Sequence, residues 1–196
     1  MTPDQLPDPL RVALNFAETL EQLGVPYFAA GSLASSVHGE PRSTDDIDFV
    51  ADLRPNHVAA LVAALAPEYY LDPDAVRDAV ARGDPFNAIH LATAVKVDVF
   101  VAGTDVFDAE RMARREAVQI WSAPPRQLYV DTAEHTVLRK LEWYRRGGGV
   151  SDRQWRDVLG VLRAQGARLD RVRLAEWASR LGLEELLERA LRESHG

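Results

Sequence analysis

The sequence predicts an α/β domain over residues 1–125 followed by a small helical domain over residues 126–196. In the first part, short apolar runs with strand character alternate with longer segments whose apolar residues have helical spacing. Pro124-Pro125 interrupts this alternation, and beyond it only helical spacing recurs. A chain of 196 residues is long enough to bury a core in one domain or in two small ones.

The helices of the first part are expected where apolar residues recur every three or four positions. The first of them ends at Gly24, just before Pro26, and the fourth is capped by Asp72 and ended by Gly83. The expected helices cover residues 10–23, 32–37, 55–65, 75–81 and 105–115.

The strands of the first part are shorter and rich in Val, Ile, Phe and Tyr. Along residues 46–51, Asp46 and Asp48 point to one face, while Ile47 and Phe49 point to a core on the other. The expected strands cover residues 27–30, 46–51, 86–92, 96–102 and 117–121.

The second part is expected to form a small helical bundle. Val137, Leu138 and Leu141 make an apolar stripe on its first helix, which ends at the Gly147-Gly148-Gly149 run. The expected helices cover residues 132–146, 152–164, 171–180 and 183–193.

The composition is that of an ordinary globular protein, with 46% apolar and 27% charged residues. No run approaches the roughly 18 apolar residues that span a bilayer, and the first residues lack the features of a secretory signal. The chain has no cysteine, so disulfides, thiolate zinc sites and cysteine nucleophiles are excluded. A cytoplasmic location without membrane attachment is the default expectation.

The charge is distributed unevenly along the chain. The net charge of −7 argues against a protein that coats nucleic acid by bulk attraction. Residues 1–125 carry a net charge of −10 and residues 126–196 a net charge of +3. An acidic, metal-seeking half and a mildly basic half would suit a nucleotide enzyme with an anionic co-substrate, although chance composition explains the difference equally well.

Asp46 and Asp48 are the strongest candidates for chemistry. Aspartate is depleted in strands, and two carboxylates on one strand face repel each other unless a cation neutralises them. Oxygen ligands of this kind favour Mg²⁺ or Mn²⁺ over Zn²⁺. The alternative is a pair of solvated aspartates on an edge strand.

Asp98 is the candidate for a third carboxylate. It shares a strand face with Lys96 and Phe100, while Val97 and Val99 lie on the other face. An unpaired carboxylate among such residues would be costly to bury. The alternative is a simple ion pair between Asp98 and Lys96.

Gly31 and Ser32 form a turn between an expected strand and an expected helix. Glycine lets the backbone approach phosphate oxygens, and the serine hydroxyl and N–H groups can donate to them. The alternative is an ordinary turn in which Ser32 caps the helix. Arg42 is expected either to contact phosphate or to brace the loop, and Thr44 to orient the following strand or to form a turn.

These residues together resemble the DNA-polymerase-β-type nucleotidyltransferase superfamily. The resemblance is carried by Gly31-Ser32, by the run His38-Gly39-x-x-Arg42-x-Thr44-x-Asp46-x-Asp48 and by a later aspartate on a strand. Within the superfamily, the chain is most similar to the small bacterial AbiEii and MenT-type toxin group. The similarity is clear over residues 25–105 and looser over residues 131–162.

The resemblance implies a mixed sheet flanked by helices and a metal-dependent transfer of NMP from an NTP such as ATP to a hydroxyl acceptor. Two Mg²⁺ (or Mn²⁺) ions would be held by Asp46, Asp48 and Asp98, and Asp98 would help to deprotonate the acceptor. The acceptor would be an RNA 3′ end (tRNA for MenT-type toxins), a protein side chain or a small molecule. A toxin of this group would also have a cognate antitoxin.

Lys140 and Asp157 are further nucleotide-binding candidates. The chain contains 21 arginines and only two lysines, so each lysine is notable. In the resembling group, a helical lysine after the catalytic domain binds nucleotide phosphate, and an aspartate on the next helix is also functional. Asp157 lies away from the apolar stripe of its helix, so a solvated aspartate is the alternative there.

Two other functions use the same residues. A catalytically inactive relative would serve as a binding module, although the presence of all three carboxylates weighs against it. A metal-dependent phosphohydrolase would release phosphate from NTP without labelling an acceptor, and the Gly31-Ser32 turn argues modestly against it.

Overall fold

The computed structural model describes residues 6–44, 46–122 and 124–194. The chain forms two compact units: unit 1 comprises Met1–Ala30 and Thr44–Val130, and unit 2 comprises Gly31–Ser43 and Asp131–Gly196. Segment 31–43 therefore leaves the α/β part and belongs to the helical part.

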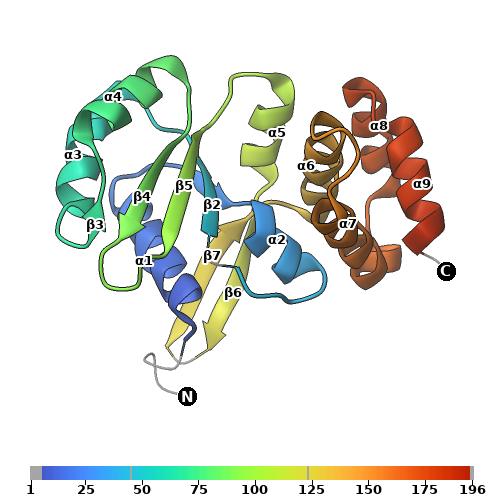
Figure 1. Ribbon diagram of the computed structural model, residues 1–196, viewed down its shortest axis with the longest axis horizontal. Helices are drawn as coiled ribbons and strands as arrows, with labels where there is room; N and C mark the ends of the chain where they lie inside the picture. Colours follow the sequence, from blue (N-terminus) through green and yellow to red (C-terminus); the bar gives the residue numbers. More distant parts are fainter. Residues whose placement is uncertain (1–5, 45, 123, 195–196) are drawn as a thin grey trace. The chain divides into compact units, whose positions relative to one another are not determined.

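Unit 1 is built on a mixed sheet that, within the described residues, has seven strands in the order β3-β4-β5-β2-β1-β7-β6 (Figure 1). β2 runs parallel to β5, and β1 runs parallel to β7, whereas the other neighbours are antiparallel. The strands are β1 Tyr27–Ala29, β2 Asp46–Ala51, β3 Tyr69–Tyr70, β4 Phe86–His90, β5 Lys96–Val101, β6 Glu116–Ser122 and β7 Pro125–Val130.

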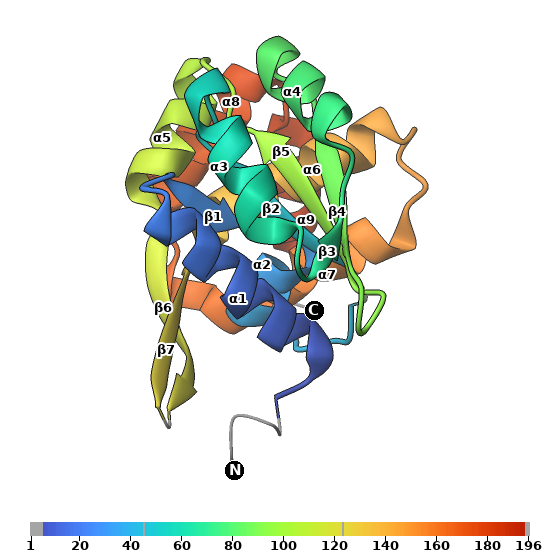
Figure 2. The same ribbon diagram turned by 90° about the vertical axis from the view of Figure 1, so that its left-hand side faces the viewer.

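The two faces of this sheet are covered differently. The ring of Phe16 stacks on Phe49 at 5.3 Å between centroids, which fixes α1 against one face. Figure 2 shows α1 and α3 in front of the strands. On the other face, Met112 of α5 packs against Phe28 and Val50. The helices of unit 1 are α1 Asp8–Gln22, α3 Pro55–Leu65, α4 Pro73–Arg82 and α5 Val106–Arg114.

Unit 2 is helical. Its helices are α2 Gly31–His38, α6 Ala133–Arg146, α7 Asp152–Gln165, α8 Arg171–Leu181 and α9 Glu184–Ser194, with a short 3-10 turn at Gly166–Arg168. Residue 39 lies so close to α7 that a Cβ there would be 2.8 Å from the backbone nitrogen of Val161, so glycine is required. A hydrogen bond of 2.6 Å joins Nε2 of His38 to the carbonyl oxygen of Asp131 and ties α2 to the segment before α6.

The predicted fold class is confirmed: the chain combines a mixed sheet flanked by helices with a C-terminal helical part. β3 and β7 were not expected from the sequence. The expected domain boundary at residues 125/126 lies at the start of β7, which pairs with β6, and the compact units divide at Val130 instead. Proline is tolerated there because the first residue of a strand need not donate a ladder hydrogen bond.

Among the residues that the structure describes, no helix is long and apolar enough to cross a membrane.

Candidate functional site

Four charged side chains lie together on one face of the sheet of unit 1. In the parallel register of β2 and β5, Asp48 lies opposite Asp98, and Asp46 lies opposite Lys96. The Nζ atom of Lys96 is 2.8 Å from Oδ2 of Asp98 and 3.7 Å from Oδ1 of Asp46. We call these four residues the carboxylate face. The structure thus brings together the three aspartates that the sequence singled out, with a lysine among them.

The carboxylate face carries more negative than positive charge. Three carboxylates and one ammonium give a formal charge of −2. The hydrogen bond to Asp98 raises the pKa of Lys96, and the nearby carboxylates of Asp46 and Asp48 add to this effect, although partial burial opposes it. The side chains of Asp46, Lys96 and Asp98 are 58%, 40% and 23% exposed, so all three reach solvent.

The donor atoms of the carboxylate face suit a hard divalent cation, because they are carboxylate oxygens on one sheet face. Within residues 6–44, 46–122 and 124–194, no three His, Cys, Asp or Glu side chains already form a group that could hold a metal ion. A cation does lie among the oxygens, namely the ammonium of Lys96. The donor chemistry of the carboxylate face therefore suits Mg²⁺ or Mn²⁺, and in this structure the ammonium of Lys96 lies among the oxygens of Asp46 and Asp98.

Two hydrogen bonds hold the backbone of the first half of β2, which carries Asp46 and Asp48. The N–H of Ala30 donates to the carbonyl oxygen of Asp48 at 2.8 Å. The hydroxyl of Thr44 donates to the carbonyl oxygen of Asp46 at 2.8 Å and so contacts the first residue of the strand.

Asn87 is a further polar residue beside the carboxylate face, and the sequence reasoning did not select it. It lies opposite Asp98 in the antiparallel register of β4 and β5, so the two side chains share a face. The alternation of buried Phe86 and Ala88 with exposed Asn87 was the signal available in the sequence.

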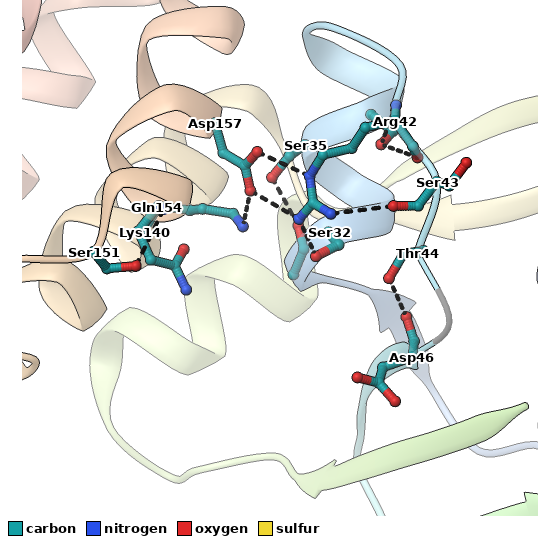
Figure 3. Close-up of polar contacts among 12 residues, drawn as sticks. Ser32, Ser35, Arg42, Ser43, Thr44, Asp46, Lys140, Ser151, Gln154 and Asp157 are labelled. Carbon is teal, nitrogen blue, oxygen red and sulfur yellow. Dashed lines mark hydrogen bonds and ion pairs between the residues drawn. The ribbon is translucent and has the colours of Figure 1, made fainter.

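A second charged group lies entirely within unit 2 and centres on Asp157 of α7 (Figure 3). Arg42 donates to both carboxylate oxygens, from Nε at 3.0 Å and from Nη2 at 3.1 Å. Lys140 of α6 donates from Nζ to Oδ2 at 2.5 Å. Arg42 also donates to the hydroxyl oxygen of Ser32 at 2.5 Å. We call Ser32, Arg42, Lys140 and Asp157 the Asp157 cluster.

Two side chains of the Asp157 cluster are buried, and its four residues together carry a formal charge of +1. The side chains of Lys140 and Asp157 are each only 7% exposed, and two cations share one carboxylate. Burial alone would raise the pKa of Asp157, but the hydrogen bonds from Arg42 and Lys140 outweigh burial and lower it. Asp157 is therefore an ion-paired residue and not a solvated carboxylate.

The turn at Gly31 leads the chain into the Asp157 cluster. Gly31 has φ +57°, a left-handed conformation that glycine adopts without a Cβ penalty. The hydroxyl of Ser35 donates back to the carbonyl oxygen of Gly31 at 2.8 Å and holds the first turn of α2. Arg42 donates to Ser32, to Asp157 and to the carbonyl oxygen of Ser43, contacts that brace the loop, while its phosphate-binding role stays a prediction.

No protein-family model and no curated protein matches this sequence. Solved structures do match the fold. Two of them are of the antibiotic-resistance factor ANT(2'')-Ia. Its solution structure matches with a TM-score of 0.54 and 15% identity, over 93% of this chain and 99% of that chain. Its crystal structure in complex with adenylyl-2''-tobramycin matches with a TM-score of 0.56 and 14% identity, over 89% of this chain and 99% of that chain. A third is of an antigenic nucleotidyltransferase-like protein from Paracoccidioides brasiliensis, with a TM-score of 0.52 and 16% identity over 92% of this chain and 90% of that chain.

The chain has the nucleotidyltransferase fold. At 14–16% identity this likeness concerns the fold alone. Membership in the predicted superfamily and in its AbiEii and MenT-type group stays a prediction.

Proposed function

We propose that this protein transfers a nucleoside monophosphate from an NTP, ATP among them, to a hydroxyl acceptor and releases pyrophosphate. The observation that carries the proposal is the carboxylate face: Asp46, Asp48 and Asp98 share one sheet face on paired strands. This arrangement occurs in a chain with the nucleotidyltransferase fold. Neither the fold nor the three carboxylates alone would carry the proposal.

Asp46, Asp48 and Asp98 would hold Mg²⁺ or Mn²⁺. When bound, the metal would supply positive charge at the phosphate oxygens and at the attacking and leaving oxygens. Two ions are proposed, as the resemblance implies.

Asp98 is proposed to accept the proton of the acceptor hydroxyl. The side chain of Asp98 is 23% exposed, so its carboxylate oxygens reach solvent and can accept a hydrogen bond from an acceptor hydroxyl. As that proton leaves, the acceptor oxygen forms a bond to the α-phosphorus. The bond from this phosphorus to the bridging oxygen of the β-phosphate breaks, and pyrophosphate departs.

The Asp157 cluster is proposed to bind the triphosphate. Two cations on one carboxylate leave an excess positive charge that a phosphate oxygen can neutralise, and the hydroxyl of Ser32 adds a donor. The N–H groups at Gly31 and Ser32 open a helix, where anions are favoured. Asp157 contributes to nucleotide binding by holding Arg42 and Lys140 in place.

The acceptor class follows from weaker observations. One solved structure with this fold holds an adenylylated aminoglycoside, which supports a hydroxyl on a small molecule. Unit 2 has a formal charge of only +2, which gives an RNA 3′ end, such as that of tRNA, modest support. A protein acceptor, a toxin role and a cognate antitoxin rest on the sequence resemblance.

The test is a labelling assay with the purified chain, Mg²⁺ and each of the four NTPs labelled at the α-phosphate. Parallel reactions contain total tRNA, an aminoglycoside such as tobramycin, or the protein alone. We expect label to move to one acceptor with an equal amount of pyrophosphate, and Asp46→Asn to abolish both.

Two outcomes would replace this function with another. Phosphate release without a labelled acceptor would indicate a phosphohydrolase. If neither label transfer nor pyrophosphate appears while Mn²⁺ binding is measurable, the chain is a binding module and the enzyme proposal fails.

A further inference from the structure

Lys96 occupies the position that a cation would take on the carboxylate face. Its ammonium lies 2.8 Å from Asp98 and 3.7 Å from Asp46, on the oxygens assigned above to a divalent metal. Mg²⁺ needs carboxylate oxygens at about 2.0–2.1 Å, so an ammonium on the same oxygens excludes it. The face thus already contains a monovalent counter-ion that belongs to the chain.

The backbone of Lys96 is fixed, so only its side chain can move. Lys96 is paired with Asp46 on one side and with Ile89 on the other. The turn before it is closed by hydrogen bonds from Ala94 N–H to the His90 carbonyl and between the His90 ring and the Thr93 hydroxyl, both 2.8 Å. In contrast, the side chain is 40% exposed on a flexible four-carbon stem.

The presence of lysine rather than arginine at position 96 also indicates that this cation can be exchanged for a metal ion. The chain has 21 arginines but places one of its two lysines here. An arginine could bind two carboxylates with its planar fork and would hold them firmly, whereas a lysine is a compact charge that rotates away more readily.

We propose that Lys96 is a resident cation of the carboxylate face, which a divalent metal ion must displace, and that it thereby sets the metal affinity of the nucleotide-free protein. With Lys96 in place the four residues carry a formal charge of −2, and without it they carry −3. The inference rests on the proposed metal role of this site and is independent of the acceptor and of the transfer reaction.

The test is the dissociation constant of Mn²⁺ for the full chain without nucleotide, measured by electron paramagnetic resonance. We expect Lys96→Met to bind Mn²⁺ at least about tenfold more tightly than the wild type, because the competing and repelling charge is gone. Lys96→Arg should bind no more tightly than the wild type. Equal or weaker Mn²⁺ binding by Lys96→Met overturns the inference.

Arg82→Met is the matched control. It removes one positive charge from an exposed arginine of α4 that pairs with Asp78, and it changes the net charge of the chain by the same amount. Its Mn²⁺ affinity should equal that of the wild type. An equal gain in both variants would assign the effect to overall charge and would also overturn the inference.

A second measurement uses the wild-type chain, in case Lys96→Met does not fold. Reductive methylation with ¹³C-formaldehyde labels the α-amino group of the chain and its two lysines, Lys96 and Lys140, and the spectra of Lys96→Arg and Lys140→Arg assign the two lysine signals. Titration with Mg²⁺ should shift the Lys96 signal and leave the Lys140 signal in place, and EDTA should reverse the shift. A Lys96 signal that does not respond to Mg²⁺ overturns the inference.

These readouts separate the inference from the proposed function. Metal competition with no nucleotidyl transfer would contradict the enzyme proposal alone. Transfer activity with unchanged metal affinity in Lys96→Met would contradict the Lys96 inference alone.

Discussion

The carboxylate face and the Asp157 cluster are opposite in charge and in burial. On the carboxylate face, one ammonium lies beside three carboxylates and pairs with two of them, and the side chains of Asp46, Lys96 and Asp98 are 23–58% exposed. In the Asp157 cluster, two cations serve one carboxylate, and Lys140 and Asp157 are each 7% exposed. The four residues of the carboxylate face carry a formal charge of −2 and those of the Asp157 cluster a formal charge of +1, so the first favours binding of a cation and the second binding of an anion.

The ion pairs of the two clusters therefore contribute differently to ligand binding and to stability. Exposed pairs contribute about 0–1 kcal/mol to stability, so their partners can be exchanged for a ligand at little cost. Removing one partner of a buried pair leaves an uncompensated charge and destabilises the fold strongly. We therefore expect substitutions on the carboxylate face to lower activity while leaving the stability of the fold unchanged, and substitutions in the Asp157 cluster to lower both.

The largest effect is expected at Asp48. Asp48→Asn should reduce nucleotidyl transfer by about a thousandfold, because the loss of metal-centred charge stabilisation costs several kcal/mol of barrier. The melting temperature should change little, and Asp78→Asn on α4 serves as the exposed control. Initial rates with saturating Mg²⁺ are the measurement. A fully active Asp48→Asn would remove this residue from the site.

The next effect is on stability. Asp157→Asn should lower the free energy of unfolding by about 3 kcal/mol, because Arg42 and Lys140 would be left without their shared carboxylate. Urea denaturation measures it, with Asp152→Asn, an exposed position at the start of the same helix, as the control. A decrease in the free energy of unfolding of less than about 0.5 kcal/mol is what an exposed ion pair contributes, and it would contradict the proposed difference between the two clusters.

Lys140→Ala should act on nucleotide binding rather than on metal binding. The loss of one charge-assisted contact, about 1.5–3 kcal/mol, should raise the KM for NTP about tenfold or more. The Mn²⁺ dissociation constant of the free protein should stay the same, since Lys140 pairs with Asp157 and the proposed metal ligands are Asp46, Asp48 and Asp98. An unchanged KM in the folded variant would argue against the phosphate-binding role.

The smallest effect is a dependence on acid pH. Because the pKa of Asp157 is lowered in the folded chain, the unfolded chain binds this proton more readily. The stability from Asp157 is therefore fully present above about pH 4, the ordinary pKa of the carboxyl, and is lost as the pH falls through the lowered value. Urea titrations from pH 7 to pH 2.5 should show the wild type approaching Asp157→Asn. A constant difference between the two would contradict the assignment.

The sequence predicted most elements where local signals are strong. The strand at 46–51 and the helix at 55–65 have the expected bounds, because alternation and a proline at the first helical turn mark them locally. β3 has two residues, too few for a period, and β7 begins at the second residue of the proline pair that indicated a boundary. β7 meets β1 through Ala29 and Val130, a pairing that depends on the whole sheet.

In the candidate site, too, some features could be predicted from the sequence and others only from the tertiary structure. Residue types and the two-residue period of a strand were enough to select Asp46, Asp48 and Asp98 and to predict which face they share. The tertiary structure alone decided the register that sets Asp48 opposite Asp98 and the ammonium of Lys96 between two carboxylates. It alone joined Arg42 to Asp157 across 115 positions of the chain. Periodicity is encoded locally, whereas register and long-range ion pairs depend on how separate segments pack, and no single stretch of sequence contains that information.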